Sequence, residues 1–579
     1  MKFGKQPAPV ADINEDNLEV HKPKAEAAGV KAVMVALERA VAQAGGARTA
    51  HSLLRLNQRG GFDCPGCAWP ESDKKRKTAE FCENGAKAVA EEATRRRVTA
   101  DFFAWHTIDD LAAQTDHWLG QQGRLTTPVV RRRGDDRYEP ISWVDAFGLI
   151  ADELRALDSP DEAVFYTSGR TSNEAAFLYQ LLVRRFGTNN LPDCSNMCHE
   201  SSGVALTETI GAGKGSVLID DIHTADLLFV VGQNPGTNHP RMLTALEKAK
   251  ENGGRVIAVN PLPEAGLLRF KNPQRPRGIV GHGTALADLF LQVRVNGDLA
   301  LFLALGRRLL VDDAVDHGFL GDHTDGFDAW ASHVRSLDES TLLEACGLSV
   351  SDLDAAHRMV VESRSIIVCW AMGLTQHRNS VATIREIVNF LLLRGNIGRP
   401  GAGVCPVRGH SNVQGDRTMG IYEKPPAWTP RLGEVFGFDP PAEVGFDTVA
   451  AIEAMADGRA KVFLGMGGNF VSAAPDTEVT MAALRRCRLT VQVSTKLNRS
   501  HAVIGEQALI LPALGRTDRV QQVTVEDSMG VVHVSEGMLE PPSPDVLSEV
   551  AIVCRLARRL LGPDDPTPWE RFEADHDLV

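Results

Sequence analysis

The sequence predicts an α/β protein whose parallel strands form two lobes. From about residue 115 onward, short runs rich in β-branched residues alternate with helical patterns, which is typical of α/β proteins. These runs form two groups, one in the first half of this region and one after residue 460. A proline-rich connection at 423–443 separates the two groups, so the chain is expected to build two sheets.

Individual elements follow from local patterns. The strand-like run AVFYTSG begins at Ala163, and the apolar-periodic helix NEAAFLYQLLVRRFG follows it and ends on a glycine. DLLFVVGQNP and GRVIAVNPLP are two further strands, with the helix MLTALEKAKENGG between them. This βαβ unit predicts a parallel sheet, because its crossover connection has a fixed hand. KVFLGMGGNF, RLTVQVSTKL and QALILPAL form the second group.

Composition narrows the function classes. A chain of 579 residues is expected to form three or four domains at about 150 residues each. The net charge of −13 argues against nucleic-acid binding, because such proteins usually present a basic face. Arg95–Arg97 and Arg131–Arg133 are two basic runs that can hold a phosphate, although either run alone is better interpreted as a solvated edge.

No segment of the sequence predicts a membrane span. A spanning helix needs roughly 18 to 20 apolar residues, and no run reaches that length. The N-terminus lacks the apolar stretch of a signal peptide. We therefore expect a cytoplasmic protein, in which the ten cysteines are thiols, core residues or ligands rather than disulfides.

Four predicted strands end in small or amide residues, at 230–239, 258–263, 464–470 and 492–497. Ligands of open α/β sheets lie beyond the carboxyl ends of strands, where glycine lets a backbone N–H approach a phosphate. Any single strand end of this kind is more often an ordinary loop. Four together favour a large nucleotide ligand, although neither GxGxxG nor a P-loop motif occurs. The predicted contacts are Gly232, Asn234, His239, Asn260, Gly467, Asn469, Ser494 and Lys496.

The segment DCSNMCHESSG at 193–203 is the most informative stretch. Cys198 is followed by His199 in a polar loop, and a thiolate is a soft ligand that suits a metal with other sulfur ligands. A lone Cys-His pair is more often a buried cysteine beside a surface histidine. The surrounding sequence decides between these interpretations.

That surrounding sequence, FGTNNLPDCSNMCHESSGVALTETIGAGKGS, resembles the active-site segment of formate dehydrogenase catalytic subunits in the molybdopterin oxidoreductase family. TSGRTSNEAAF (167–177), HTADLLFVVGQNPGTNHP, AMGLTQHRNSVATIREI (371–387) and LRGNIGRPGAGVCPVRGHSNVQGDRTMG (393–420) resemble the family's motifs too. The similarity extends from about residue 46 to 579.

The resemblance implies roles for single residues. Cys198 is implied to be the protein ligand of molybdenum or tungsten, His199 the adjacent proton-handling residue, and Arg385 the group that binds the substrate carboxylate. A guanidinium offers formate a planar bidentate fork, which lysine cannot supply. On pattern alone Arg385 is a solvated helix charge. Gly373, Gln376 and Arg408 join the strand-end residues as predicted contacts of a bis-molybdopterin guanine dinucleotide cofactor.

The segment 61–85 is the candidate iron–sulfur segment, with Cys64, Cys67 and Cys82 resembling ligands of the family's [4Fe–4S] cluster. Such a cluster takes four cysteines, and the position of the missing one falls near Glu71, with Asp73 close by. Either a carboxylate or another residue supplies the fourth ligand, or the cluster is altered or absent. A structural zinc site is the alternative. Asn84 stands where the family has a lysine between cluster and pterin.

The architecture implied by the resemblance is a formate dehydrogenase/DMSO reductase-like fold. It comprises a polar N-terminal extension (1–45), an iron–sulfur region (46–114), one discontinuous α/β lobe (115–193 plus 388–579) and an inserted α/β lobe (194–387) carrying Cys198. The family's C-terminal β-barrel cap is expected to be missing from this chain. Cys194, Cys346, Cys369, Cys405, Cys487 and Cys554 are interpreted as core or incidental.

Three functions stay open at this stage. The first is oxidation of formate to CO2 or the reverse, with electrons passing through the cluster to a partner protein. The second is the same cofactor acting on another small substrate, because the family keeps its fold and changes its pocket. The third is a degenerate relative without activity. The sequence does not choose between molybdenum and tungsten, since both take the same sulfur ligands.

Overall fold

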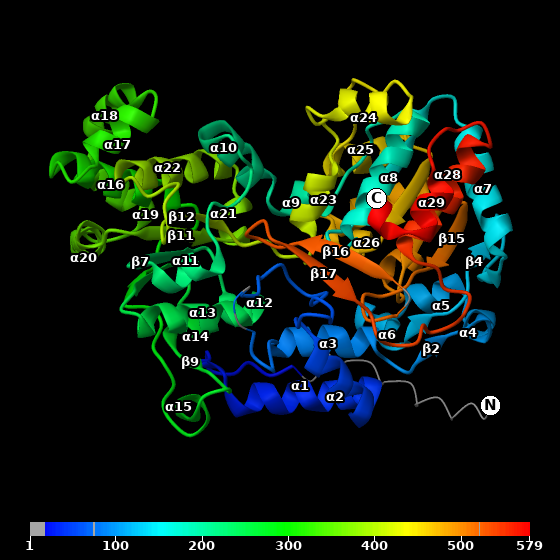
Figure 1. Cartoon of the computed structure of the whole chain (residues 1–579), viewed down its shortest axis with the longest axis horizontal. Helices are drawn as coiled ribbons and strands as arrows, with labels where there is room; N and C mark the ends of the chain where they lie inside the picture. Colours follow the sequence, from blue (N-terminus) through cyan, green and yellow to red (C-terminus); the bar gives the residue numbers. More distant parts are fainter. Residues whose placement is uncertain (1–17, 73, 75, 520) are drawn as a thin grey trace.

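The computed structural model describes residues 18–72, 74, 76–519 and 521–579. Two sheets form its centre, one in each of the two lobes that stand side by side in Figure 1. The N-terminal helices lie beneath both lobes, along the lower edge in that view. This arrangement confirms the α/β class, and among the described residues no sheet closes on itself.

The first lobe contains a five-stranded parallel sheet in the order β10-β8-β7-β11-β12. Its strands are β7 (Leu227–Val231), β8 (Arg255–Val259), β10 (Leu289–Leu291), β11 (Ile366–Trp370) and β12 (Gly403–Pro406). The predicted βαβ unit is confirmed as β7, α13 (Pro240–Glu251) and β8.

Helices cover both faces of this sheet, so its strands are almost continuously apolar. Phe229 and Val231 of β7 face a core shared with α16 and α22, whereas Leu228 and Val230 face a core shared with α13. The helices of this lobe are α10 (Glu200–Ile210), α11 (Ile219–Thr224), α16 (Asp298–Val311), α17 (His317–His323), α18 (Phe327–Ser336), α19 (Glu339–Cys346), α20 (Val350–Glu362), α21 (Met372–Thr375) and α22 (Ser380–Leu393).

The second lobe contains a six-stranded sheet in the order β5-β4-β15-β14-β13-β6. β6, β13, β14 and β15 are parallel, whereas β4 runs antiparallel both to β15 and to the edge strand β5. The strands are β4 (Val129–Arg131), β5 (Glu139–Pro140), β6 (Ala163–Thr167), β13 (Val462–Met466), β14 (Leu489–Ser494) and β15 (Gln507–Pro512). Strands from both ends of the chain share this sheet, as expected for a discontinuous lobe.

Helices also cover both faces of the second sheet. They are α7 (Trp143–Arg155), α8 (Asn173–Phe186), α23 (Val413–Met419), α24 (Thr429–Phe436), α25 (Thr448–Asp457), α26 (Phe470–Ala473), α27 (Thr477–Arg485), α28 (Glu549–Leu561) and α29 (Trp569–Ala574). α7, α8 and α28 pack on one face, and α25 and α27 on the other.

One predicted boundary is wrong. We expected the inserted lobe to end at residue 387, but that position lies inside α22, which packs on the first lobe. β12 then pairs in register with β11, Cys369 opposite Cys405. The chain therefore returns to the second lobe only after Pro406, because its last strand still completes the first sheet.

The N-terminal region is helical and carries the cysteine segment in its loops. Its helices are α1 (Gly29–Ala44), α2 (Gly46–Arg55), α3 (Glu83–Glu92), α4 (Ala100–Trp105), α5 (Ile108–Ala112) and α6 (Asp116–Gln121). A hairpin of β16 (Gln522–Glu526) and β17 (Val532–Glu536) reaches this region, where the backbone N–H of Asp63 donates to Ser535 Oγ at 2.9 Å. No helix of the described residues is long and apolar enough to cross a membrane.

Candidate active site

A cavity of about 900 Å³ lies where the carboxyl ends of the two sheets meet. A second cavity of about 490 Å³ shares part of its wall, including Ser168, Arg170 and His410. Segments that follow β6, β7, β11, β12 and β13 line the first cavity, and the end of β14 lines the second. The volumes suit large ligands, and their place at the strand ends is the expected one.

Most of the predicted cofactor contacts lie on these walls. Gly232, His239, Gly373, Gln376 and Asn469 line the first cavity, and Gly467, Asn469, Ser494 and Lys496 line the second.

Asn234, Asn260 and Arg408 do not line either cavity. The Asn234 amide donates to Glu264 at 2.5 Å, and the Asn260 amide donates to the carbonyl of Gln233 at 3.0 Å. Both side chains brace the loops behind the wall, because the strand-end turns point them back toward neighbouring loops.

Gly232 and Gly373 meet where β7 and β11 end. The N–H of Gly373 donates to the carbonyl of Gly232 at 3.0 Å, and Gly232 has φ of +56°. A Cβ on Gly373 would lie 2.4 Å from that carbonyl oxygen. Glycine is therefore required here for the two loops to cross. It would also let a backbone N–H approach a phosphate.

Cys198 lies at the end of the short helix α9 (Cys194–Cys198) and lines the first cavity. Asp193 and Asn196 cap the start of this helix, and Thr375 Oγ1 donates to the Cys198 carbonyl at 2.6 Å. Burial raises the pKa of the thiol, while the Arg408 charge and the backbone N–H of Gly409 oppose that rise. Cys198 is thus a fixed, buried sulfur with a positive charge beside it, which suits a thiolate ligand.

His199 does not face the cavity, contrary to the role expected for it. Its Nε2–H donates to the Val407 carbonyl at 3.1 Å, and its Nδ1 lies 3.0 Å from Ser202 Oγ. Ser202 also accepts the indole N–H of Trp370 at 3.0 Å. Burial, followed by the Arg408 charge, holds the pKa of His199 well below its usual value. The ring is neutral and fully hydrogen-bonded, so it orients the Cys198 loop rather than exchanging protons in the cavity.

Arg385 is also not where the resemblance led us to expect it. Its guanidinium pairs with Glu208 on the surface of α22, with about 46 % of the side chain exposed, and it does not line the cavity. The helix turns it outward, as the pattern-based interpretation of TIREIV predicted.

Arg408 is the arginine beside Cys198. It is buried, and its charge acts on both Cys198 and His199. One Nη donates to the Gly213 carbonyl at 3.0 Å, but the Nε–H has no partner. The charges of Glu200 and Glu526 act on this guanidinium, but these carboxylates form their ion pairs with Arg417 and Lys214. A buried, unpaired charge is costly, so this position is suited to an anionic ligand.

Five residues on the cavity walls carry a buried polar atom that lacks a partner. These atoms are Nδ1 of His239, Nδ1 of His410, Oγ of Ser494, Oε1 of Gln233 and Nε of Arg241. His239 donates its Nε2–H to the Arg408 carbonyl at 2.9 Å, so its Nδ1 is an acceptor. Unsatisfied groups of this kind indicate a polar ligand that supplies the missing hydrogen bonds. The residues present therefore fit a large polar cofactor that carries phosphates and ring N–H groups.

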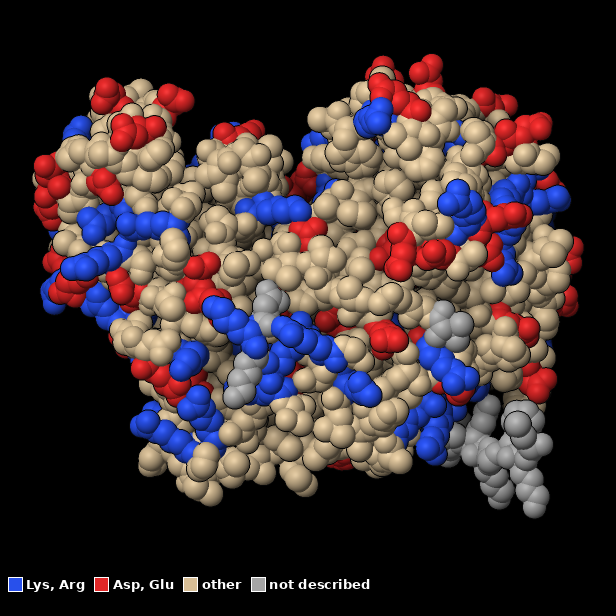
Figure 2. All heavy atoms as spheres, viewed as in Figure 1, with Lys and Arg blue, Asp and Glu red and all other residues tan. Residues whose placement is uncertain are grey.

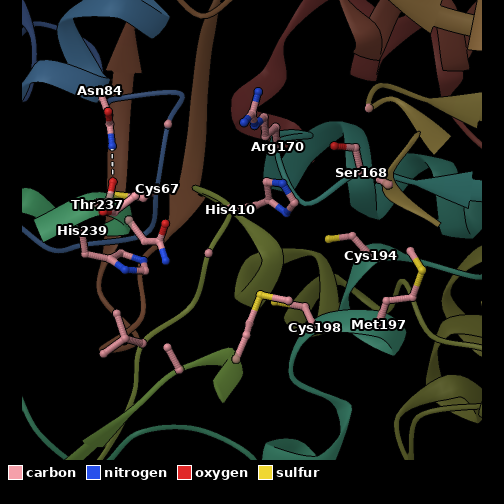
Figure 3. A pocket seen from close by; sticks show the side chains of 18 of the residues that line it. Cys67, Asn84, Ser168, Arg170, Cys194, Met197, Cys198, Thr237, His239 and His410 are labelled. Atoms are coloured by element: carbon pink, nitrogen blue, oxygen red, sulfur yellow. Dashed lines mark hydrogen bonds between the residues drawn. The ribbon is translucent and has the colours of Figure 1, made fainter. Parts of the chain in front are cut away.

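Cys194 shares the cavity wall with Cys198, one turn earlier on α9 (Figure 3). Its interpretation as an incidental cysteine needs correction, because helical spacing places both thiols on one face. The other five cysteines with that interpretation are confirmed as core residues, namely Cys346, Cys369, Cys405, Cys487 and Cys554.

Cys64, Cys67 and Cys82 line the opposite end of the same cavity (Figure 3 labels Cys67). The N–H of Gly66 donates to Cys64 Sγ, and that of Gly85 to Cys82 Sγ, each at 3.4 Å. Burial raises the pKa of Cys67 to about 11, and the neighbouring Cys82 adds to this rise. The fold thus gathers the three thiols predicted as ligands.

The spacing of the three sulfurs argues against zinc. Tetrahedral zinc with bonds of about 2.3 Å holds its sulfurs about 3.8 Å apart. Among the described residues, the one group of three His, Cys, Asp or Glu ligand atoms within 4.8 Å of one another is Asp63, Glu71 and His533. At least one pair of the three sulfurs is therefore more than 4.8 Å apart, so these thiols do not form a preformed zinc site.

Glu71 does not complete the cysteine set. Its carboxylate pairs with Arg241 at 2.6 Å and lies 3.7 Å from His533 Nδ1. Arg241 also binds Glu80 at 2.8 Å and lines the cavity beside the cysteines. Asp73 lies outside the described residues.

The network around Glu71 predicts a pH-dependent stability. Asp527 lies 2.7 Å from His533 Nε2 and, with Asp63 and Glu71, overcomes burial and raises the pKa of His533 to about 9. The histidine ordinarily titrates near 6.5, so its stabilisation is fully present below that pH and is lost as pH rises through about 9. The wild-type chain should be more stable than His533→Gln at pH 6.5, and the difference between their Tm values should shrink as the pH is raised in steps to 9.5. A Tm difference that stays constant from pH 6.5 to 9.5 would contradict the raised pKa of His533.

Asn84 lies between the cysteines and the rest of the cavity. Its amide donates to the Thr237 carbonyl at 2.6 Å, close to His239 (Figure 3). A short neutral side chain thus stands where the family pattern has a lysine. The cysteine end and the Cys198 end of the cavity are joined here by Asn84, Thr237 and His239.

Comparisons with known proteins identify relatives over nearly the whole chain. A family model described as molybdopterin oxidoreductase matches residues 124–514. An uncharacterized oxidoreductase of Mycobacterium tuberculosis is 62 % identical over 583 residues, covering 98 % of this chain and 75 % of the relative. Protein YdeP of Escherichia coli is 44 % identical, covering 91 % and 72 %.

A more distant relative is formate dehydrogenase H of Escherichia coli, 29 % identical over 400 residues that cover 66 % of this chain and 52 % of that enzyme. Among solved structures, acetylene hydratase from Pelobacter acetylenicus matches with a TM-score of 0.62 and 17 % identity. That match covers 80 % of this chain and 64 % of the hydratase, and at this identity it shows a shared fold alone.

Proposed function

Because the chain belongs to the molybdopterin oxidoreductase family, we propose that it is a formate dehydrogenase-like catalytic chain. It would hold molybdenum or tungsten with two molybdopterin guanine dinucleotides, and a [4Fe–4S] cluster. The observation that carries this proposal is the cavity-lining thiol of Cys198, with the buried guanidinium of Arg408 beside it, directly behind the wall formed by Val407, Gly409 and His410.

We assign each part of the cofactor to residues of these walls. Gly232, His239, Gly373 and Gln376 would contact one dinucleotide, while Ser494 and Lys496 would contact the other. Cys198 would be the protein ligand of the metal. When bound, this centre takes up the electron pair that leaves the substrate.

Arg408, rather than Arg385, is the group that we assign to the substrate anion. Formate offers two equivalent oxygens, and a guanidinium can bind both with parallel hydrogen bonds. Arg408 already lacks a carboxylate partner, so formate would relieve a buried, unpaired charge. Oxidation converts the anion into neutral CO2, which this charge no longer holds.

His410 is our candidate proton acceptor in place of His199. It lines both cavities, and burial together with the Arg170 charge lowers its pKa to about 4. The ring is therefore neutral near pH 7, with Nδ1 free of any partner among the described residues. This neutral imidazole offers an acceptor nitrogen at the cavity wall, and a bound anionic cofactor would raise its pKa toward the range in which it takes up the substrate proton.

The cysteine segment predicts a measurable iron content. If Cys64, Cys67 and Cys82 hold a [4Fe–4S] cluster with a non-cysteine fourth ligand, the purified protein should contain about four irons per chain and give a cluster EPR signal on reduction. Cys67→Ala should lose that iron and block electron transfer to an external dye while the metal at Cys198 stays bound. Cys346→Ala, in the core of the first lobe, should keep the iron. One zinc per chain without iron would overturn this assignment.

A partner protein is the proposed destination of the electrons. Figure 2 shows Lys and Arg gathered across the lower middle of this face, where the segment between α2 and α3 lies in Figure 1. That segment contains Lys74, Arg76 and Lys77 beside the cysteines. A basic area on a chain of net charge −13 supports an acidic electron carrier as the partner.

A second candidate function is the oxidation or reduction of another small substrate with the same cofactor. It is favoured by the relatives at 62 % identity, whose description names no substrate, and by the surface position of Arg385, which pairs with Glu208 and does not line the cavity. Metal, pterin and iron analysis tests the cofactor set. A steady-state assay with formate and a dye acceptor then separates the two functions, since a loaded enzyme inactive on formate would support the second.

A further inference from the structure

Helix α1 presents an apolar face to solvent. Val30, Met34, Leu37 and Val41 are each between 45 % and 63 % exposed. They repeat at the i, i+4, i+7, i+11 spacing that places side chains on one side of a helix. Val33 adjoins them and is 39 % exposed. Exposed apolar side chains are ordinary when scattered, but a contiguous stripe of this length indicates an interaction surface.

The flank of α1 next to this stripe is already packed. Ala36, Ala40 and Ala44 are buried, with Ala36 in a core that also contains residues of α2 and α3. The small residues therefore face the protein, and the large apolar residues face outward. A helix that is apolar on two faces is normally buried on both.

The surface around this stripe is accessible in the structure. α1 and α2 form the lower edge of the molecule in Figure 1, and Figure 2 shows an area with few charges along that edge. Leu54 of α2 is 57 % exposed and adds to the apolar area next to α1.

The charges beside the stripe are self-complementary. Lys31 and Glu38 are seven residues apart, so they lie on the same flank of the helix, on the side away from the buried alanines. Two copies of α1 packed antiparallel about a twofold axis would place Met34 against Leu37 and Val30 against Val41. In that register Lys31 of each copy lies about 3 Å along the axis from Glu38 of the other, given a rise of about 1.5 Å per residue.

We propose that this face of α1 binds a second copy of the chain in a twofold, antiparallel helix pair. An isologous interface uses the same patch on both copies. It therefore needs an apolar centre, and positive charges of one copy that meet negative charges of the other across the twofold axis. The α1 stripe has both features. A 16-residue helix spans about 24 Å, and one helix pair buries less than the roughly 800 Å² per partner of a standard interface. The expected dimer is therefore concentration-dependent.

Sedimentation velocity of the purified chain over a range of about 1 to 100 µM tests the proposal. The wild-type chain should show a monomer–dimer equilibrium. Met34→Ser and Leu37→Ser should each raise the dimer Kd at least tenfold, because each removes two contacts at the centre of a twofold interface. Leu262→Ser, an exposed leucine elsewhere, is the matched control and should change nothing.

Charge exchange distinguishes this geometry from any other use of the stripe. Lys31→Glu and Glu38→Lys should each weaken the homodimer, because the homodimer of either variant brings residues 31 and 38 of opposite copies together with the same charge, twice. An equimolar mixture of the two variants, or the double variant in one chain, should restore association.

Three results would overturn the proposal. They are a wild-type chain that is monomeric at every concentration, a dimer that is insensitive to Leu37→Ser, and charge variants that the mixture does not rescue. The first would mean that a different partner, or further chain of a longer form, covers α1.

Discussion

Replacing Cys198 by alanine is expected to abolish turnover while the fold and most of the pterin remain. The side chain lines a cavity, so its loss removes one metal ligand and little core packing. Turnover should fall to background, and the metal content should drop while pterin content stays close to wild type. Cys198→Ser is a milder change, because a harder oxygen ligand binds a soft site less well.

Cys194→Ala is the matched control for this variant. It removes a thiol from the same helix and the same cavity wall, one turn away. We expect it to keep the metal and substantial activity. If Cys194→Ala lost the metal and Cys198→Ala kept full activity, the ligand assignment would belong to Cys194 and the account of the site would change.

The fold and the family were predictable from the sequence because their signals are local and repeated. Buried parallel strands appear as apolar runs that end in small residues, as at Ser168 after β6, Gly232 after β7, Gly467 after β13 and Ser494 of β14. The predictions of the α/β class and of the family are confirmed. The gathering of Cys64, Cys67 and Cys82 was implied by the resemblance of their segment to the family's cluster motif, and a turn and the start of α3 bring them to one cavity.

Side-chain direction was not predictable in the same way. His199 follows Cys198 directly, yet the end of α9 turns the ring toward Val407 and Ser202. Arg385 lies in a segment that resembles a family motif, but its position on α22 directs its side chain to Glu208. Both outcomes depend on tertiary packing against segments that are distant in sequence. The predicted end of the inserted lobe at residue 387 was too early for a related reason. β12 joins the first sheet only after α22 and a loop, and this pairing depends on tertiary contacts.

Arg408 illustrates what the sequence left out. It was predicted as a cofactor contact from the motif PVRGHSNVQG, and nothing in the motif shows that its guanidinium lies beside Cys198 without a carboxylate partner. A short strand, β12, delivers this segment to the cavity next to α9. Only the packing of the segment after β12 against α9 shows which arginine lies close enough to Cys198 to bind an anion there.

Arg408→Lys should therefore raise the KM for formate far more than Arg385→Lys does. A point charge cannot reproduce a bidentate fork, and losing one charge-assisted pair costs on the order of 1.5 to 3 kcal/mol, or roughly ten- to a hundredfold in KM. Arg385→Lys keeps the charge on an exposed ion pair of small energetic weight, so KM should stay within about twofold. Steady-state kinetics on variants with matched metal and pterin content make the comparison. A large KM effect at Arg385 with none at Arg408 would return the substrate role to Arg385, and unchanged kinetics in both variants would mean that neither guanidinium binds formate.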